Sequence, residues 1–120
     1  MSFAFSYRSA DGVDRHLPGI YVVTVGALVV YVGKYLSWKR PFRAYARNVR
    51  RHQLGLPYRL GKPGDWRRIH LELSDAVRRG DEVAITIVEN VIDPVKRAAR
   101  EAELIAEYRA LGLARCNATP

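Results

Sequence analysis

The sequence predicts a single domain of the α/β class (α+β type), in which helices flank a small three-stranded antiparallel sheet. The chain has 120 residues and an apolar fraction of 48%, which is enough for one packed core. Two runs rich in β-branched residues lie on either side of a glycine and indicate strands. Three later segments have apolar residues at helical spacing, or the residues that usually begin and end a helix. The predicted order of elements is β-β-α-α-β-α, with no repeat or linker.

Each predicted helix has an apolar face or a recognisable end. The first carries apolar residues at helical spacing, and these are Phe42, Tyr45, Ala46 and Val49. The second is predicted to begin after the N-cap Asp65 and to stop at Gly80. The third follows Asp93 and Pro94, an N-cap and a proline in the first turn, and stops at Gly112. The predicted helices are 41–53, 65–79 and 94–111, and the strands are 20–25, 28–32 and 83–88.

The first two strands form a predicted hairpin around Gly26. The turn decides where Tyr21 and Tyr31 point, because a shift of one residue moves a side chain to the other face of a sheet. A three-residue turn places both tyrosines opposite each other on one face. A two-residue turn of Gly26 and Ala27 places them on opposite faces, unless a bulge restores the register.

The chain is strongly basic, and the charge is concentrated in one window. Lys and Arg number 20 against 12 Asp and Glu, a net charge of +8. Residues 34–68 contain eleven Lys or Arg, one acid and six of the twelve aromatic residues. Aromatic rings within a basic segment favour a nucleic-acid surface over a merely solvated face, because phosphates attract cations and bases stack on rings. The residues predicted to contact nucleic acid are Arg40, Arg47, Arg50, Arg51, Lys62 and Arg67.

Other classes of protein are excluded by composition. The single cysteine, Cys116, rules out a disulfide framework, and no Cys/His spacing is typical of zinc. The histidines are dispersed, as expected of packed or solvated residues: His16, His52 and His70. The longest apolar run, 20–32, is too short to span a bilayer, and the N-terminus has no signal sequence. We therefore expect a soluble cytoplasmic protein without a membrane partner.

Two tripeptides on the hairpin give a more specific indication. The letters GIY at 19–21 are followed, nine residues later, by YVG at 31–33. This pair resembles the signature of the GIY-YIG nucleases, and the basic helix and the order of elements agree with that family. The resemblance continues through Glu101 and Asn117. The predicted unit is one domain over 1–120, with an N-terminal extension at 1–18 and a core at 19–117.

Helix geometry singles out one acidic residue. At 100° per residue, Glu101 lies about 40° from Ile105, on the apolar side of its helix, whereas Glu103 and Glu107 lie about 160° away from Ile105. Burying a carboxylate is costly unless something compensates its charge. A divalent cation could do so, and a structural arginine partner is the alternative. The resemblance implies that Glu101 holds a single Mg²⁺ or Mn²⁺.

The resemblance also implies roles for an arginine and an asparagine, and the position of a lysine suggests a role for it. A phosphate-binding arginine belongs on the first helix, near Pro41, and either Arg40 or Arg43 could supply it. Arg43 is favoured because a residue before proline is biased out of helical geometry. Lys34 follows the second tripeptide and could favour a tyrosine phenolate. Asn117 corresponds to an asparagine that orients the site, although a residue so near the chain end could equally fray.

The implied activity is metal-dependent hydrolysis of phosphodiester bonds in DNA, with RNA not excluded as a substrate. Tyr21 would take the proton from the attacking water, helped by Tyr31 and Lys34, if nearby cations lower its pKa. No separate recognition domain is visible, so specificity is expected to be low, structure-directed, or supplied by a homodimer or a partner protein. The alternatives are a catalytically silent nucleic-acid-binding module of this fold, and a small RNA-binding or ribosome-associated protein.

Overall fold

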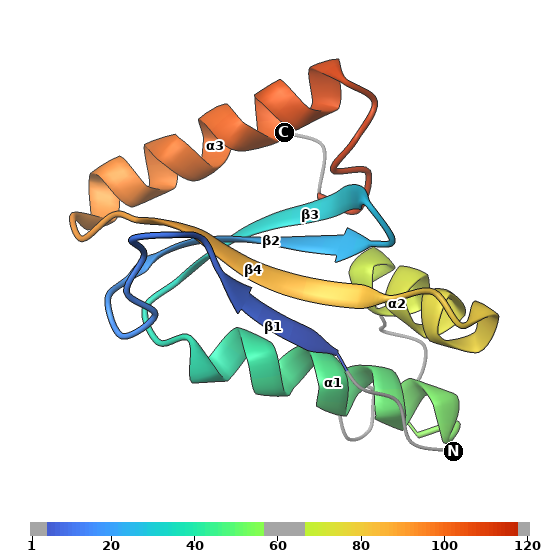
Figure 1. Cartoon of the computed structure of the whole chain (residues 1–120). Helices are drawn as coiled ribbons and strands as arrows, with labels where there is room; N and C mark the ends of the chain where they lie inside the picture. The colour runs from blue at the N-terminus through green and yellow to red at the C-terminus, as the bar shows by residue number, and fades with distance from the viewer. Residues whose placement is uncertain (1–4, 57–66, 118–120) are drawn as a thin grey trace.

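The computed structural model describes residues 5–56 and 67–117. In this part of the chain a four-stranded sheet is covered by α1 and α2 on one face and by α3 on the other (Figure 1). The strand order is β1-β4-β2-β3, so β3 forms one edge. The elements are β1 Ser6–Ser9, β2 Gly19–Val25, β3 Leu28–Tyr35, α1 Lys39–Gln53, α2 Arg68–Arg79, β4 Val83–Asn90 and α3 Pro94–Ala110.

The predicted fold class is confirmed, but the sheet contains one strand more than predicted. β1 pairs in parallel with β4, from Ser6 opposite Ala84 to Ser9 opposite Ile87, so the sheet is mixed and not purely antiparallel. This strand is short, polar and largely exposed, and it therefore lacks the apolar pattern that reveals a strand in a sequence. Its partner lies far along the chain, and only the tertiary structure shows the pairing.

A core fills each side of the sheet. The larger core packs β2 and β4 against the predicted apolar face of α1, where Phe42, Tyr45 and Val49 are buried as expected. The smaller core lies under α3 and contains Ile20, Val22, Val32, Leu104 and Ala114. Successive residues of β2 thus enter different cores, which follows from the alternation of side chains along a strand.

The register of the hairpin decides whether Tyr21 and Tyr31 lie on the same face of the sheet. Val25 pairs with Leu28, so the turn has two residues and the three-residue alternative does not form. One step further along the hairpin the register shifts, and Val30 has no partner in β2. This bulge returns Tyr21 and Tyr31 to the same face of the sheet. The second predicted alternative, a two-residue turn corrected by a bulge, is confirmed.

The helix ends agree with most of the predicted signals. Asp93 caps α3, where its carboxylate accepts a hydrogen bond from the backbone N–H of Lys96 at 2.9 Å. Gly80 ends α2 in the left-handed conformation that glycine favours. The helix α2 begins at Arg68, and the predicted cap Asp65 lies outside the described residues. None of the described helices is long and apolar enough to cross a membrane.

The start of α1 differs from the prediction. The helix begins at Lys39 and not at Pro41, so Arg40 has helical geometry. Proline is tolerated there because the backbone N–H groups of the first turn have no partner within the helix. The argument that placed Arg40 outside the helix is therefore wrong.

Candidate active site at the edge of the sheet

Three tyrosines meet between the sheet and α1. The hydroxyl of Tyr21, on β2, lies 2.7 Å from the hydroxyl of Tyr45, on α1. The ring of Tyr31, on β3, is centred 6.3 Å from that of Tyr21 and 6.2 Å from that of Tyr45. Only 5% of Tyr21 is exposed, and burial raises the pKa values of both Tyr21 and Tyr45 well above that of free tyrosine.

Two glycines allow close approaches around this cluster. Tyr21 pairs with Gly33, and a Cβ atom at Gly33 would overlap the Tyr21 ring. The ring therefore extends across β3, the edge strand. A Cβ atom at Gly19 would overlap the backbone carbonyl of Glu89 in β4. The glycine of each tripeptide is thus required by packing in this chain.

Glu101 approaches from the opposite face of the sheet, on α3. Its side chain is half-buried, and burial raises its pKa. The Lys34 ammonium and a hydrogen bond from the Lys34 backbone partly offset this rise. The side chains of Glu103 and Glu107 are 62% and 65% exposed, in agreement with the helix geometry. Among the described residues no arginine forms an ion pair with Glu101, so the structural-partner alternative finds no support.

The two faces come together because β3 is the edge strand. Tyr21 lies on the side of α1, and Glu101 lies on the side of α3. The negative charge of Glu101 is nevertheless near enough to raise the pKa of Tyr21. Lys34, which faces α3, lines the same groove as Tyr21. Three of the predicted site residues, Tyr21, Lys34 and Glu101, therefore come together at the edge of β3.

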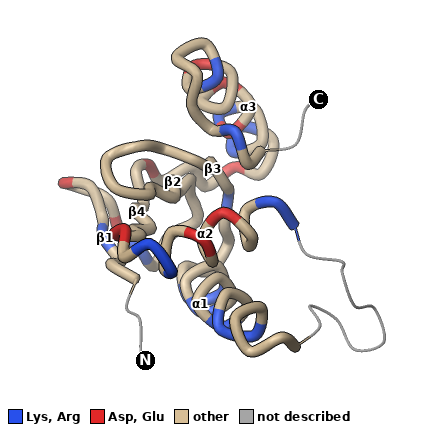
Figure 2. Tube along the Cα trace, turned by 90° about the vertical axis from the view of Figure 1, so that its right-hand side faces the viewer, with Lys and Arg blue, Asp and Glu red and all other residues tan. Residues whose placement is uncertain are grey.

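A large basic groove runs along this edge. Its volume is about 1180 Å³, and no carboxylate is among its described lining residues. Figure 2 shows Lys and Arg along α1 and where the chain enters α2. Seven cationic side chains line the groove: Lys34, Arg40, Arg43, Arg47, Arg51, Arg67 and Arg97. Such a concentration of one sign of charge attracts polyanions.

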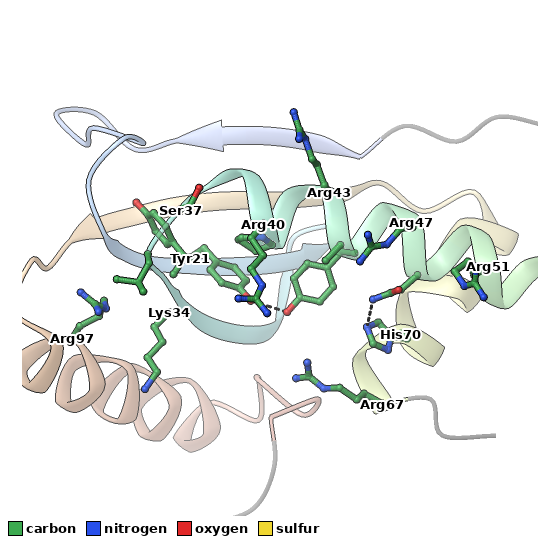
Figure 3. A pocket seen from close by; sticks show the side chains of 16 residues that line it. Tyr21, Lys34, Ser37, Arg40, Arg43, Arg47, Arg51, Arg67, His70 and Arg97 are labelled. Atoms are coloured by element: carbon green, nitrogen blue, oxygen red, sulfur yellow. Dashed lines mark hydrogen bonds between the residues drawn. The ribbon is translucent and has the colours of Figure 1, made fainter. Parts of the chain in front are cut away.

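The arginines of α1 divide between two flanks of the helix. Arg40, Arg47 and Arg51 are seven and four residues apart and form one stripe that lines the groove. In Figure 3, Arg40 points into the groove toward the tyrosine hydroxyls, whereas Arg43 points away from Tyr21. Arg50 is exposed and is not among the lining residues. Of the two predicted contacts Arg47 and Arg50, only Arg47 therefore lines the groove, because periodicity alone does not show which flank of the helix borders it.

Arg67 connects α2 to the tyrosine cluster. Its guanidinium donates a hydrogen bond to the Tyr31 hydroxyl at 3.0 Å and lies 5.7 Å from the centre of that ring. Its positive charge lowers the pKa of Tyr21, but burial outweighs this effect. In the protein alone, nearby cations therefore do not lower the pKa of Tyr21 below that of free tyrosine, which was the condition for Tyr21 to act as a base. The remaining predicted contact, Lys62, lies outside the described residues.

The Asn117 side chain is hydrogen-bonded to the backbone of the edge strand. Its side-chain amide donates to the carbonyl oxygen of Val32 at 2.8 Å and accepts from the backbone N–H of Val32 at 2.9 Å. The backbone N–H groups of Ala114 and Cys116 also donate to carbonyls of β3. The end of α3 and the segment after it thus fix the strand that carries Tyr31 and Gly33.

A comparison with solved structures finds the GIY-YIG N-terminal endonuclease domain of UvrC from Thermotoga maritima. That domain was solved as a tyrosine-to-phenylalanine point mutant bound to the catalytic divalent cation. The match covers 88% of this chain and 87% of that one, with 19% sequence identity and a TM-score of 0.44. This chain is similar to it in fold. No family model matches the sequence, and no curated protein matches it.

Sequence reasoning missed two residues of this candidate site. Tyr45 was interpreted only as a core residue, although a buried tyrosine hydroxyl usually needs a hydrogen-bond partner. Arg97 is 6% exposed and donates hydrogen bonds to the carbonyls of Val91 and Ile92 at 3.1 and 3.0 Å. It precedes Glu101 by four residues, so the two share one side of α3, and this spacing could have revealed it.

The donor set fits a single hard cation that also binds the substrate. The described residues contain no cluster of three or more His, Cys, Asp or Glu side chains that could hold a metal ion by themselves. Glu101 offers one half-buried carboxylate near the groove. Mg²⁺ commonly takes one or two carboxylates and completes its shell with water and phosphate oxygens. The residues present are compatible with this mode of binding.

Proposed function

We propose that this protein is a metal-dependent endonuclease that hydrolyses phosphodiester bonds in DNA. The observation that carries the proposal is the basic groove, which has Tyr21 in its wall and Glu101 close to it. Six of the groove cations are exposed or partly exposed, and with no carboxylate among the described lining residues they provide a binding track for a phosphate backbone. A half-buried glutamate beside that track provides a negative charge where a divalent cation is needed.

Glu101 is the proposed ligand of one Mg²⁺ or Mn²⁺ ion. When bound, the ion polarises the scissile phosphate and stabilises charge on the leaving oxygen. Binding of a cation would also offset the cost of burying the Glu101 carboxylate, which the raised pKa of that group reflects. The Lys34 backbone, through its hydrogen bond, holds the carboxylate in place.

Arg40 is the proposed phosphate-binding arginine in place of Arg43, because it points toward the tyrosine hydroxyls. A guanidinium there neutralises the negative charge that develops on the phosphate in the transition state. Arg47 and Arg51 continue the same stripe and are proposed to bind the flanking phosphates.

Tyr21 is proposed to take the proton of the attacking water. In the free protein its raised pKa keeps the phenol neutral at neutral pH. The hydrogen bond with Tyr45 and the charge of Arg67 both favour the ionised form, although they do not outweigh burial. We therefore propose that Tyr21 ionises only when DNA and a divalent cation occupy the site.

The first test compares two variants in which a glutamate of α3 is replaced by glutamine. Purified wild type, Glu101→Gln and Glu103→Gln are each incubated with plasmid DNA, with Mg²⁺ or Mn²⁺ and with chelator. We expect metal-dependent nicking by the wild type and a loss of about 100-fold or more in Glu101→Gln. Glu103→Gln removes the same charge from the exposed side of the helix, and its rate should stay within about twofold of the wild type.

DNA binding measured on the same proteins separates the alternatives. Glu101→Gln should retain salt-sensitive binding, because the groove cations are unchanged. Absence of nicking by the wild type, with binding intact, would favour a catalytically silent nucleic-acid-binding module. Equal nicking by Glu101→Gln and the wild type would remove the metal role from Glu101. RNA tested in parallel shows whether the substrate class extends beyond DNA.

A further inference from the structure

A second cationic surface lies at the start of α1, next to the groove. The loop between β1 and β2 brings Arg15 onto Trp38, with the guanidinium carbon 4.5 Å from the ring centroid. The Lys39 ammonium lies 5.9 Å from the same centroid, and the His16 ring lies edge-on at 6.2 Å. We call Arg15, His16, Trp38 and Lys39 the Trp38 cluster. Within the described residues, no carboxylate forms an ion pair with its Arg or Lys.

The loop that carries Arg15 is held in place by the sheet. The Asn90 side-chain amide donates to the carbonyl oxygens of Asp14 and Leu17 at 2.7 and 3.1 Å and accepts from the Asp14 N–H at 2.8 Å. Trp38 in turn packs against the buried Phe42, with ring centroids 5.6 Å apart. The cluster is therefore presented on an ordered support.

The cations of the cluster continue those of the groove. Ser37 and Arg40, on either side of Trp38 and Lys39 in the sequence, both line the groove (Figure 3). The first turn of α1 contains Lys39 and Arg40 and no acid. Cations at that end of a helix oppose its dipole, so their placement is unfavourable without an anion nearby. A bound anion near both surfaces would relieve this cost.

We propose that the Trp38 cluster is a second contact surface for the DNA backbone, which binds phosphates where the strand leaves the groove. This inference rests on the proposed function and extends its substrate-binding surface. The stripe from Arg40 to Arg51 spans about 16 Å along α1, which is long enough to follow a few successive phosphates of one strand. Arg15 and Lys39 would add one or two phosphates at the end near Arg40.

The chemistry of the cluster favours phosphate over a base. Arg15 already covers a face of the Trp38 ring, which is therefore not open for a base to stack on that side. Arg15 and Lys39 are exposed cations, which interact with any phosphate regardless of sequence. We therefore expect the contact to be independent of sequence.

The test compares two double variants with the same change of charge. Arg15→Ala/Lys39→Ala removes the proposed contact. Arg78→Ala/Lys96→Ala removes two exposed cations from α2 and α3, neither of which lines the groove. Binding of a duplex oligonucleotide is measured over a range of salt concentrations, together with the rate of cleavage at saturating DNA.

We expect the first variant to bind about tenfold more weakly at low salt, with the slope of log K against log salt reduced by one to two, while cleavage at saturation changes little. The control pair should retain the slope. Thermal unfolding verifies the fold, and Arg15→Gln alone, which leaves α1 unaltered, should reduce the slope by about one.

Equal slopes for both double variants would overturn the inference and leave the proposed function intact. A slope unchanged in Arg15→Gln, with the fold maintained, would likewise exclude Arg15 as a contact. If the wild type bound no DNA at low salt, the proposed function itself would fail. The two failures are therefore distinguishable in one series of titrations.

Discussion

The Tyr21 ring lies over Gly33, where any side chain would overlap it. Because Gly33 has no side chain, the buried phenol of Tyr21, on an inner strand, reaches the edge of the sheet. Lys34 and the basic groove lie at this edge. The hydrogen bond between the Tyr21 and Tyr45 hydroxyls then fixes the Tyr21 side chain. The position of the Tyr21 hydroxyl is thus determined by a glycine and by a helix residue, both outside β2.

At the same scale, the structure predicts different effects for two neighbouring arginines. Arg40→Ala should lower the cleavage rate at saturating DNA by about 100-fold, because a guanidinium at the scissile phosphate acts on the transition state. Arg43→Ala should stay within about threefold, since that side chain points away from Tyr21. Both variants lose one charge, so each is the control for the other. A larger loss in Arg43→Ala would return the catalytic role to Arg43.

Between elements, α1 and α2 are joined by buried polar contacts. The Asn48 amide donates to Nε2 of His70 at 3.3 Å, and His52 Nδ1 lies 2.8 Å from the Ser74 hydroxyl. His70 is 1% exposed, and burial lowers its pKa to about 4, helped by the charges of Arg67 and His52. We call these contacts the α1–α2 seam. They hold α2 beside the groove, and the contact of His70 requires its ring to be neutral.

The seam predicts a loss of stability in acid. Unfolded histidine takes up a proton near its ordinary pKa of about 6.5, whereas folded His70 resists it down to about 4. The unfolded state therefore binds more protons in this interval, and the free energy of unfolding falls as the pH is lowered through it, by up to about 3 kcal/mol. Denaturant unfolding at a series of pH values measures the effect.

Two histidine variants provide the comparison for this measurement. His70→Gln should show a weaker dependence on pH over the same interval, because the titrating group is gone. His16→Gln changes an exposed residue and should follow the wild type. Parallel pH curves for the wild type and His70→Gln would contradict the assignment.

For the whole molecule, the groove collects cations from α1, α2, α3 and β3, although the chain outside its basic window is slightly acidic. Binding should therefore be dominated by counterion release. With about six phosphate contacts, since Arg97 is buried, we expect the affinity for DNA to fall by about 2,000-fold between about 50 and 200 mM salt. Duplexes of unrelated sequence should show the same slope. A weak dependence on salt, or a strong preference for one sequence, would contradict this view of the groove.

The local elements could be predicted because their signals are short-range. The cap at Asp93, the stop at Gly80 and the apolar face of α1 each act within one or two helical turns. Glu101 was also assigned to the correct side of α3 by periodicity alone. β1 was missed because four polar residues at an edge have no distinguishing pattern, and their pairing with β4 crosses most of the chain.

The sequence by itself determined the order of most elements, the basic character of one segment and the two tripeptides on the hairpin. These are properties of composition and of neighbours within a few positions. Only the tertiary structure decided that a bulge at Val30 returns the tyrosines to one face, that Arg40 and not Arg43 faces them, and that Tyr45 holds Tyr21. Each of these depends on which surfaces pack together, and residues far apart in the chain determine that packing.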